Sequence, residues 1–111
     1  MKRYCLALDL IDDRTLIGEY ENYHKNVWKE ITASIKDAGI LDMEIYRVDN
    51  RLFMIMETED DFSFDKKNVM DSSNAKVQEW EQLMWKYQQA LPSAKEGEKW
   101  VLMERIYKLN N

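Results

Sequence analysis

Alternation in one segment and short apolar runs in others predict four β-strands. Residues 3–10 alternate throughout, with leucines on one face and smaller or polar side chains on the other. Two further apolar runs cover residues 43–48 and 51–57. The Asp49-Asn50 pair between them tolerates positive φ, which predicts a β-hairpin. We expect the last strand over residues 98–109.

Apolar residues at steps of three and four predict a long amphipathic helix over residues 14–38, ended by Gly39. Residues at this spacing share one face of a helix, and we expect that face to point inward. The stripe consists of Leu16, Tyr20, His24, Val27, Trp28, Ile31, Ile35 and Ala38.

A second helix is predicted after Asn74, which is a good N-cap. Its apolar positions run toward Leu91, and Pro92 ends it. The segment before it, residues 60–73, is polar and irregular, with a short helical piece around 65–70.

The resulting order, β-α-β-β-α-β, predicts a single α+β domain over residues 1–111 with the ferredoxin-like arrangement. Two helices cover only one face of an antiparallel sheet, yet the strands are apolar on both faces: Phe53 and Ile55 alternate with Met54. Burying a large apolar side chain contributes roughly 1.5–3 kcal/mol to the free energy of unfolding. Leaving the second face of the sheet exposed to water would therefore cost a small domain much of its stability. We therefore expect a homodimer whose two sheets face each other.

Composition is typical of a folded, soluble protein. Of the 111 residues, 45% are hydrophobic and 33% are charged, and no apolar run approaches the roughly 20 residues that span a membrane. The first residues lack the apolar core of a signal peptide. A net charge of −5 disfavours nucleic acid, whose phosphates are bound by lysine and arginine. We expect a cytoplasmic protein without a nucleic-acid or membrane partner.

The residues available for chemistry narrow the kinds of site. One cysteine, Cys5, and one histidine, His24, exclude an internal disulfide and a typical zinc site. The acidic residues between 57 and 61 lack the glycine and the spacing of a calcium loop. The sequence has no glycine-rich phosphate loop and no recognisable nucleophile motif. We therefore expect neither a metal nor a cofactor.

His24 is the main chemical candidate, because a titratable ring stands in the inward stripe of the first helix. An unperturbed histidine has a pKa of about 6.5 and can give and take protons near neutral pH. The commoner interpretation of one histidine on an apolar face is a core residue held by a hydrogen bond. Tyr20, one turn earlier, offers a hydroxyl, and Trp28, one turn later, offers an aromatic wall. This set suits a small polyhydroxylated ligand such as a sugar.

The segment around His24 resembles the L-rhamnose mutarotases. Residues 19–28, EYENYHKNVW, carry the Glu-Tyr, the histidine and the tryptophan of that family, and the likeness covers nearly the whole chain. Its further matches are Gly39, Ile45-Tyr46, Leu52-Phe53, Val77-Gln78-Glu79-Trp80, RLFMIME at 51–57 and GEKWVLM at 97–103. The resemblance implies a dimeric α+β barrel that exchanges the α and β anomers of a free sugar without a cofactor.

The resemblance also implies roles for individual residues. His24 corresponds to the family's proton donor, and Tyr20 corresponds to a residue that contacts the sugar. Trp80 matches the first of a tryptophan pair that lines the pocket. Glu81 stands in place of the second tryptophan, and Met43 stands in place of a substrate-contacting tyrosine. These two departures bear on sugar preference more than on the chemistry.

Several alternatives stay open at this point. L-rhamnose is the preferred sugar, and L-fucose or another 6-deoxy sugar is the nearest alternative, because the departures stand where hydroxyl orientation would be read. The base that complements His24 is Tyr20, Glu44 or a bound water. Another dimeric α+β barrel enzyme, such as a cofactor-independent monooxygenase, or a non-catalytic sugar-binding subunit would share the fold. For Trp80, packing in the core is as good an interpretation as ligand binding.

Overall fold

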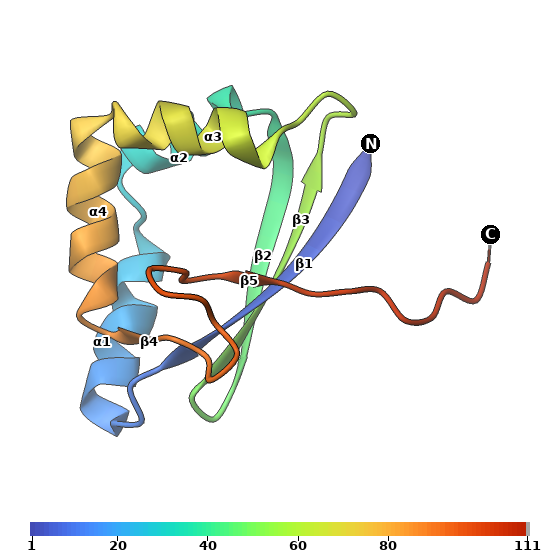
Figure 1. Ribbon diagram of the computed structural model, residues 1–111. Coiled ribbons are helices and arrows are strands. Elements are labelled where there is room, and N and C mark those ends of the chain that lie inside the picture. The colour runs from blue at the N-terminus through green and yellow to red at the C-terminus, as the bar shows by residue number, and fades with distance from the viewer. Residues whose placement is uncertain (111) are drawn as a thin grey trace.

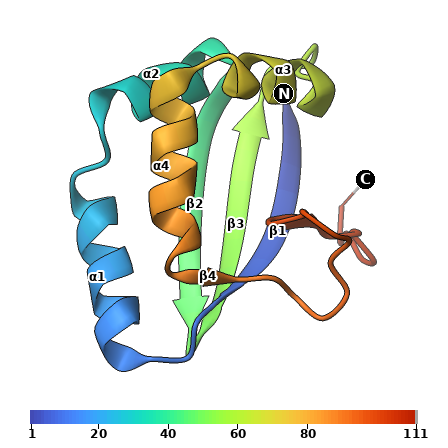
Figure 2. The same cartoon turned by 60° about the vertical axis from the view of Figure 1, so that its left-hand side comes forward.

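An antiparallel sheet with helices on one face builds the protein, and the computed structural model describes residues 1–110 (Figure 1). The strands are β1 (Lys2–Leu10), β2 (Ile40–Val48), β3 (Arg51–Thr58), β4 (Gln88–Gln89) and β5 (Val101–Leu102). The helices are α1 (Arg14–Lys25), α2 (Lys29–Asp37), α3 (Phe64–Ser72) and α4 (Ala75–Trp85). Figures 1 and 2 show α1, α2 and α4 on the same side of the sheet, with α3 across one end.

The strand order is β2-β3-β1-β4, with β5 also paired to β1, and all the pairs are antiparallel. This confirms the ferredoxin-like α+β arrangement that the order of elements predicted. The edge beside β1 is divided between two short strands, because Gln88 of β4 pairs with Leu10 whereas Val101 of β5 pairs with Ala7.

Local backbone features set the position of β2 on β3. The predicted hairpin is present, and Asp49 turns it with a φ of 49°. Gly39, between α2 and β2, has a φ of 92°, a conformation that favours glycine. The pairing of β2 with β3 then shifts at Leu41, which forms a β-bulge. After this bulge, Met43 and Ile45 point to the face that the helices cover, and both line the cavity described below.

The hydrophobic core lies between the sheet and the helices. Leu8, Leu10 and Leu52 are its most buried sheet residues, at 0%, 0% and 2% exposed. The buried residues packed with Leu10 and Leu52 are Tyr20, Ile31, Val77, Trp80, Met84 and Tyr87. Tyr20 and Trp80 are therefore held by the core even though each was a candidate for ligand contact. Within residues 1–110, the helices fall short of the length and apolar character that a membrane crossing requires.

The predicted helix over residues 14–38 is two helices. α1 ends at Lys25 and α2 begins at Lys29, with non-helical backbone at Asn26 and at Trp28, where ψ is 140°. Asparagine and β-branched valine are weak helix formers. Interrupting the helix at Asn26 and Val27 therefore loses little helix stability. Val27, Ile31 and Ile35 of the apolar stripe still line the same cavity across the break.

The second predicted helix is shorter than its periodicity indicated. Asn74 caps α4 as expected, with its side-chain oxygen accepting from the backbone N–H groups of Lys76 and Val77. α4 ends at Trp85 rather than near residue 91, and the next residues form β4. Pairing with the exposed edge of β1 therefore outweighs the helical periodicity that continues through Tyr87.

The predicted strand over residues 98–109 is also mostly absent. Only Val101 and Leu102 form β5, and the Met103 N–H makes one more bond to the Cys5 carbonyl oxygen, at 2.7 Å. Figure 1 shows the following segment leaving the sheet and extending away from the body. Ile106 and Tyr107 are 93% and 73% exposed there, so their apolar pattern finds no partner strand within the described part of the chain.

Candidate active site

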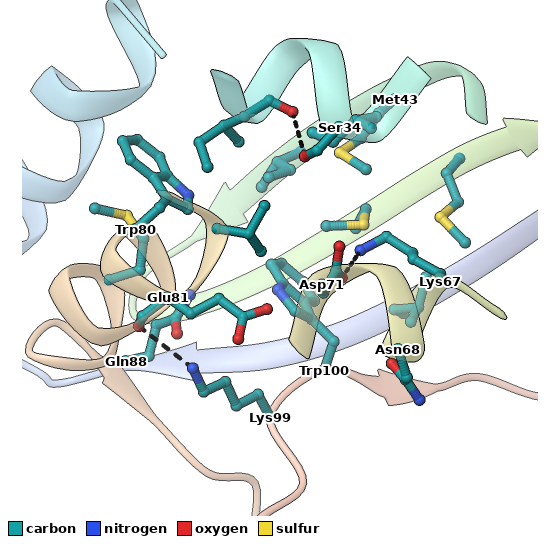
Figure 3. A pocket seen from close by; sticks show the side chains of 18 of the residues that line it. Ser34, Met43, Lys67, Asn68, Asp71, Trp80, Glu81, Gln88, Lys99 and Trp100 are labelled. Atoms are coloured by element: carbon teal, nitrogen blue, oxygen red, sulfur yellow. Dashed lines mark hydrogen bonds and ion pairs between the residues drawn. The ribbon is translucent and has the colours of Figure 1, made fainter. Parts of the chain in front are cut away.

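A cavity of about 660 Å³ lies between the inner face of the sheet and the helices (Figure 3). Its volume falls in the range of roughly 300–1,000 Å³ that is usual for small-molecule sites. Leu6, Met43, Ile45, Met54 and Met56 from the strands and Ile31, Ile35, Val77 and Met84 from the helices give it largely apolar walls. The polar side chains described next stand out against these walls.

His24 lies on the wall of this cavity, half-buried at the end of α1. Its Nδ1 is 2.8 Å from the backbone carbonyl oxygen of Tyr20, one turn earlier. The His24 ring packs against the rings of Tyr20 and Trp80, with centroids 4.3 Å and 5.7 Å away. The imidazole is thus held by a hydrogen bond, as a core histidine would be, and it also borders the cavity.

Burial lowers the pKa of His24 below its ordinary value, and the hydrogen bond to the Tyr20 carbonyl offsets only part of that effect. A buried imidazolium loses hydration that the apolar walls do not replace. The neutral ring is therefore the prevailing form near neutral pH.

The Tyr20 hydroxyl is the second polar group at this end of the cavity. The Gln88 side-chain Nε2 lies 3.5 Å from it, a long hydrogen bond that joins α1 to β4. Burial raises the pKa of Tyr20 above its ordinary value, and the contact with Gln88 opposes that shift. The phenol is therefore protonated throughout the physiological range. Sequence reasoning missed Gln88 because it placed this residue inside a helix, and periodicity carries no signal for a short edge strand.

Trp80 lines the cavity from α4, whereas Trp28 does not. The Trp28 ring packs edge-on against Trp80 with centroids 5.0 Å apart, and the ammonium group of Lys76 lies 5.7 Å from its centroid. The sequence predicted that Trp28 forms an aromatic wall of the ligand site. In the structure Trp28 instead packs against Trp80 and does not line the cavity. The helix break places Trp28 before α2 rather than one turn after His24 on the same helix.

Met43 and Glu81 both line the cavity, so the two departures from the family pattern are brought to the same site (Figure 3). Glu81 reaches into it from α4. Glu44, one of the candidate bases, does not line it: its carboxylate accepts from the Tyr46 hydroxyl at 3.0 Å, on the other face of the sheet. The alternation of β2 explains this, because neighbouring residues of a strand point to opposite faces.

A further polar cluster enters the cavity from α3. Lys67 forms an ion pair with Asp71, Asn68 lies beside them, and Asp71 is only 8% exposed (Figure 3). The sequence did not identify this cluster, because residues 60–73 look like a solvated polar segment. Only the packing of α3 against α4 turns these side chains toward the cavity.

The segment before β5 closes one side of the cavity with Glu98, Lys99 and Trp100. The Lys99 ammonium donates to the Glu81 backbone carbonyl oxygen at 3.3 Å and lies 5.1 Å from the ring centroid of Trp85. This segment is therefore pinned to α4. No cluster of histidine, cysteine, aspartate and glutamate within residues 1–110 has the arrangement of a metal site.

Comparison with known proteins gives a consistent result. Residues 3–109 match the family model described as L-rhamnose mutarotase. The chain is 43% identical to the L-fucose mutarotase of Xanthomonas campestris pv. campestris, over 99% of this chain and 90% of that protein. It is 39% identical to the L-rhamnose mutarotase of Acidiphilium cryptum over 46 residues, which are 40% of this chain and 44% of that protein.

A solved structure shares the fold. The L-rhamnose mutarotase of Formosa agariphila superposes with a TM-score of 0.72 at 18% identity, covering 99% of this chain and all of that one (100%). The family match spans almost the whole described sequence, including the segment that carries Tyr20 and His24. The chain belongs to the L-rhamnose mutarotase family of sugar isomerases.

Proposed function

We propose that this chain interconverts the α and β anomers of a free 6-deoxy-L-hexose, with His24 as a catalytic acid–base group. One observation carries the proposal: the His24 ring lies against Tyr20 and Trp80 on the wall of a cavity of suitable size. Aromatic faces pack on the C–H surfaces of a sugar, while imidazole, hydroxyl and carboxylate groups bond its oxygens. Tyr20, Trp80, Met43 and Glu81 are the proposed substrate contacts.

The reaction needs only proton transfers. One group removes the proton of the anomeric hydroxyl, another protonates the ring oxygen, and the ring opens to a free carbonyl. The carbonyl turns, and the ring closes on its other face. Well-placed acid and base groups contribute about 10²- to 10⁴-fold to such a step.

The apolar part of the cavity favours a 6-deoxy sugar. Met43, Met54 and Met56 form a polarizable wall that suits the C6 methyl group. Between the two sugars considered, we place L-fucose ahead of L-rhamnose, the sugar that the family resemblance had favoured. The Xanthomonas relative matches almost the full chain, whereas the Acidiphilium relative matches less than half of it. The two sugars differ in hydroxyl configuration at C2 and C4, and the Glu81 carboxylate is the proposed group that distinguishes them.

A panel of free sugars tests this function. Saturation-transfer NMR measures the exchange between α and β anomers of L-fucose, L-rhamnose and L-galactose, with and without enzyme. We expect exchange above the uncatalysed rate for both 6-deoxy sugars and the highest rate for L-fucose. L-galactose, which adds only a C6 hydroxyl to L-fucose, should react about tenfold or more slowly, because burying an unpaired hydroxyl costs about 1–3 kcal/mol. If the enzyme accelerates anomer exchange of neither 6-deoxy sugar, the proposal is contradicted. Sugar binding without faster exchange would indicate a sugar-binding subunit.

We further propose that the active protein is a homodimer in which two sheets pack face to face. The face of the sheet away from the helices carries Phe53 and Ile55 from β3 and Tyr46 and Val48 from β2, the last two 53% and 68% exposed. The Arg51–Asp9 and Arg3–Glu57 ion pairs flank this apolar patch on the same face. An apolar patch with a charged rim is typical of an interface rather than of a surface in water. A second copy of the same face is the simplest complement.

A further inference from the structure

We infer that His24 begins the reaction as the base and that the Tyr20 hydroxyl is the proton donor. This inference rests on the proposed mutarotase function and differs from the role that the family resemblance gives His24. It depends on three features: the hydrogen bond at His24 Nδ1, the open side of the same ring at Nε2, and the contact between Gln88 and the Tyr20 hydroxyl.

The hydrogen bond at Nδ1 fixes where the proton of the neutral ring sits. A backbone carbonyl oxygen only accepts, so the 2.8 Å contact with the Tyr20 carbonyl requires a hydrogen on His24 Nδ1. A neutral imidazole with its hydrogen on Nδ1 has a lone pair on Nε2. The Nε2 atom of this tautomer is an acceptor and has no proton to donate.

That lone pair is open to a ligand. Within residues 1–110, no protein group bonds to Nε2, and no buried side-chain nitrogen or oxygen lacks a hydrogen-bond partner. Nε2 is therefore accessible rather than sealed in the core, and His24 lines the cavity. Burial favours the neutral ring by lowering the pKa of His24, which keeps the lone pair available near neutral pH.

The Tyr20 hydroxyl has the opposite polarity. The nearest side-chain partner of its oxygen is the Gln88 amide nitrogen at 3.5 Å, and an amide N–H is a donor. The oxygen thus accepts from Gln88, and within residues 1–110 no protein group accepts the phenolic hydrogen. Tyr20 lines the same cavity, with its ring centroid 4.3 Å from that of His24. The rings that carry the donor and the acceptor are therefore in contact, one helical turn apart.

The proton transfers balance across this pair. His24 Nε2 takes the proton from the anomeric hydroxyl, and the electrons of that O–H bond form the C1 carbonyl. The bond between C1 and the ring oxygen breaks, and its electron pair takes the proton of the Tyr20 hydroxyl. An imidazolium and a phenolate remain, side by side and opposite in charge. When the ring closes on the other carbonyl face, both protons return and the enzyme is restored.

Removing the phenolic proton tests the donor. Tyr20→Phe keeps the ring and should lower kcat for anomer exchange at least tenfold while changing KM for the sugar by less than about threefold, since general acid catalysis acts in the transition state. Tyr23→Phe is the matched control: it lies on the same helix but outside the cavity lining, and it should exchange anomers within twofold of wild type. A folded Tyr20→Phe variant that raises KM with kcat unchanged would show that Tyr20 only binds.

Gln88 is the positioning residue in this scheme, and an isosteric change tests it. In Gln88→Glu the new carboxylate accepts the phenolic hydrogen and withdraws it from the sugar. We expect kcat to fall at least fivefold with KM nearly unchanged. If the Gln88→Glu variant kept the kcat of wild type, the proposed orientation of the Tyr20 hydroxyl would be contradicted.

Two readouts test the role of His24, and the first of them does not require activity. ¹⁵N NMR of the free protein at pH 7.5 should show the neutral ring with its hydrogen on Nδ1, whether or not any sugar reacts. In the active enzyme, kcat should rise with pH to a plateau, with its inflection below pH 6.5, because the unprotonated ring is the working form. The charged side chains that line the same cavity are Lys67, Asp71, Glu81, Glu98 and Lys99. A hydrogen on Nε2, or a kcat that falls with rising pH across this range, would restore His24 as the initial donor. A wild-type protein without exchange activity would overturn the mutarotase function alone.

Discussion

The two faces of the sheet have opposite environments. On β3, Leu52 and Met54 point to the helices and are 2% and 8% exposed, whereas Phe53 between them points to the other face and is only half-buried. On β2, Val48 of that other face is 68% exposed. The chain's own helices complete the inner face, and the outer face is left with apolar side chains that a second copy would cover. The cavity lies on the inner face, so the proposed chemistry and the proposed assembly would use different sides of one sheet.

The largest expected effect comes from breaking the inner face. Leu8→Ala removes a side chain that is 0% exposed and should lower the free energy of unfolding by about 2–5 kcal/mol, because the core cannot fully close the cavity that remains. Urea denaturation followed by circular dichroism measures this change. The matched change on the other face is Val48→Ala, which we expect to cost no more than about 1 kcal/mol. Equal costs would remove the distinction between the faces.

Placing a charge on the outer face should break assembly while leaving the fold intact. Ile55→Lys puts an ammonium group in the centre of the proposed interface, where burial would be costly. Sedimentation equilibrium should report a mass near the 13.4 kDa of one chain for this variant and about twice that mass for wild type. Val69→Lys is the control, because Val69 lies on α3 and is 70% exposed. A monomeric wild-type protein would contradict the proposed dimer, and a dimeric Ile55→Lys variant would place its interface elsewhere.

A smaller effect should appear in the pH dependence of stability. The pKa of His24 is lowered in the folded state, so the unfolded chain binds its proton first as the pH falls. The stability that the neutral ring contributes is fully present above about pH 6.5 and is lost as the pH falls through the lowered folded-state pKa. The difference in unfolding free energy between wild type and His24→Gln should therefore shift against wild type from pH 7.5 to 5. An unchanged difference would mean that burial does not perturb His24.

The fold was largely predictable because its signals are local. Alternation identified β1 and the β2–β3 hairpin, and Asn74 marked the start of α4. The errors arose where tertiary contacts outweighed local pattern. Gln88 continues a helical pattern but joins the edge of β1, and the apolar pattern beyond Met103 lacks a partner strand in the described chain.

Helical spacing made one part of the candidate site predictable. His24 and Tyr20 share a face at a spacing of four residues, and the structure brings them together as that spacing requires. Trp28 follows the same spacing, but the break before α2 moves it behind Trp80. The Lys67–Asp71 pair could not be foreseen, because a polar segment carries no signal of the cavity it faces until α3 packs on α4.

The most direct test of the central claim is the rate of anomer exchange in His24→Ala, measured by saturation-transfer NMR with L-fucose. We predict a loss of at least tenfold relative to wild type, with circular dichroism and sedimentation mass unchanged, because the imidazole moves protons in the reaction. Lys25→Ala, one residue away on the exposed side of α1, should exchange anomers at the wild-type rate. A folded His24→Ala protein that exchanges anomers as fast as wild type would show that His24 only fills space beside Tyr20 and Trp80.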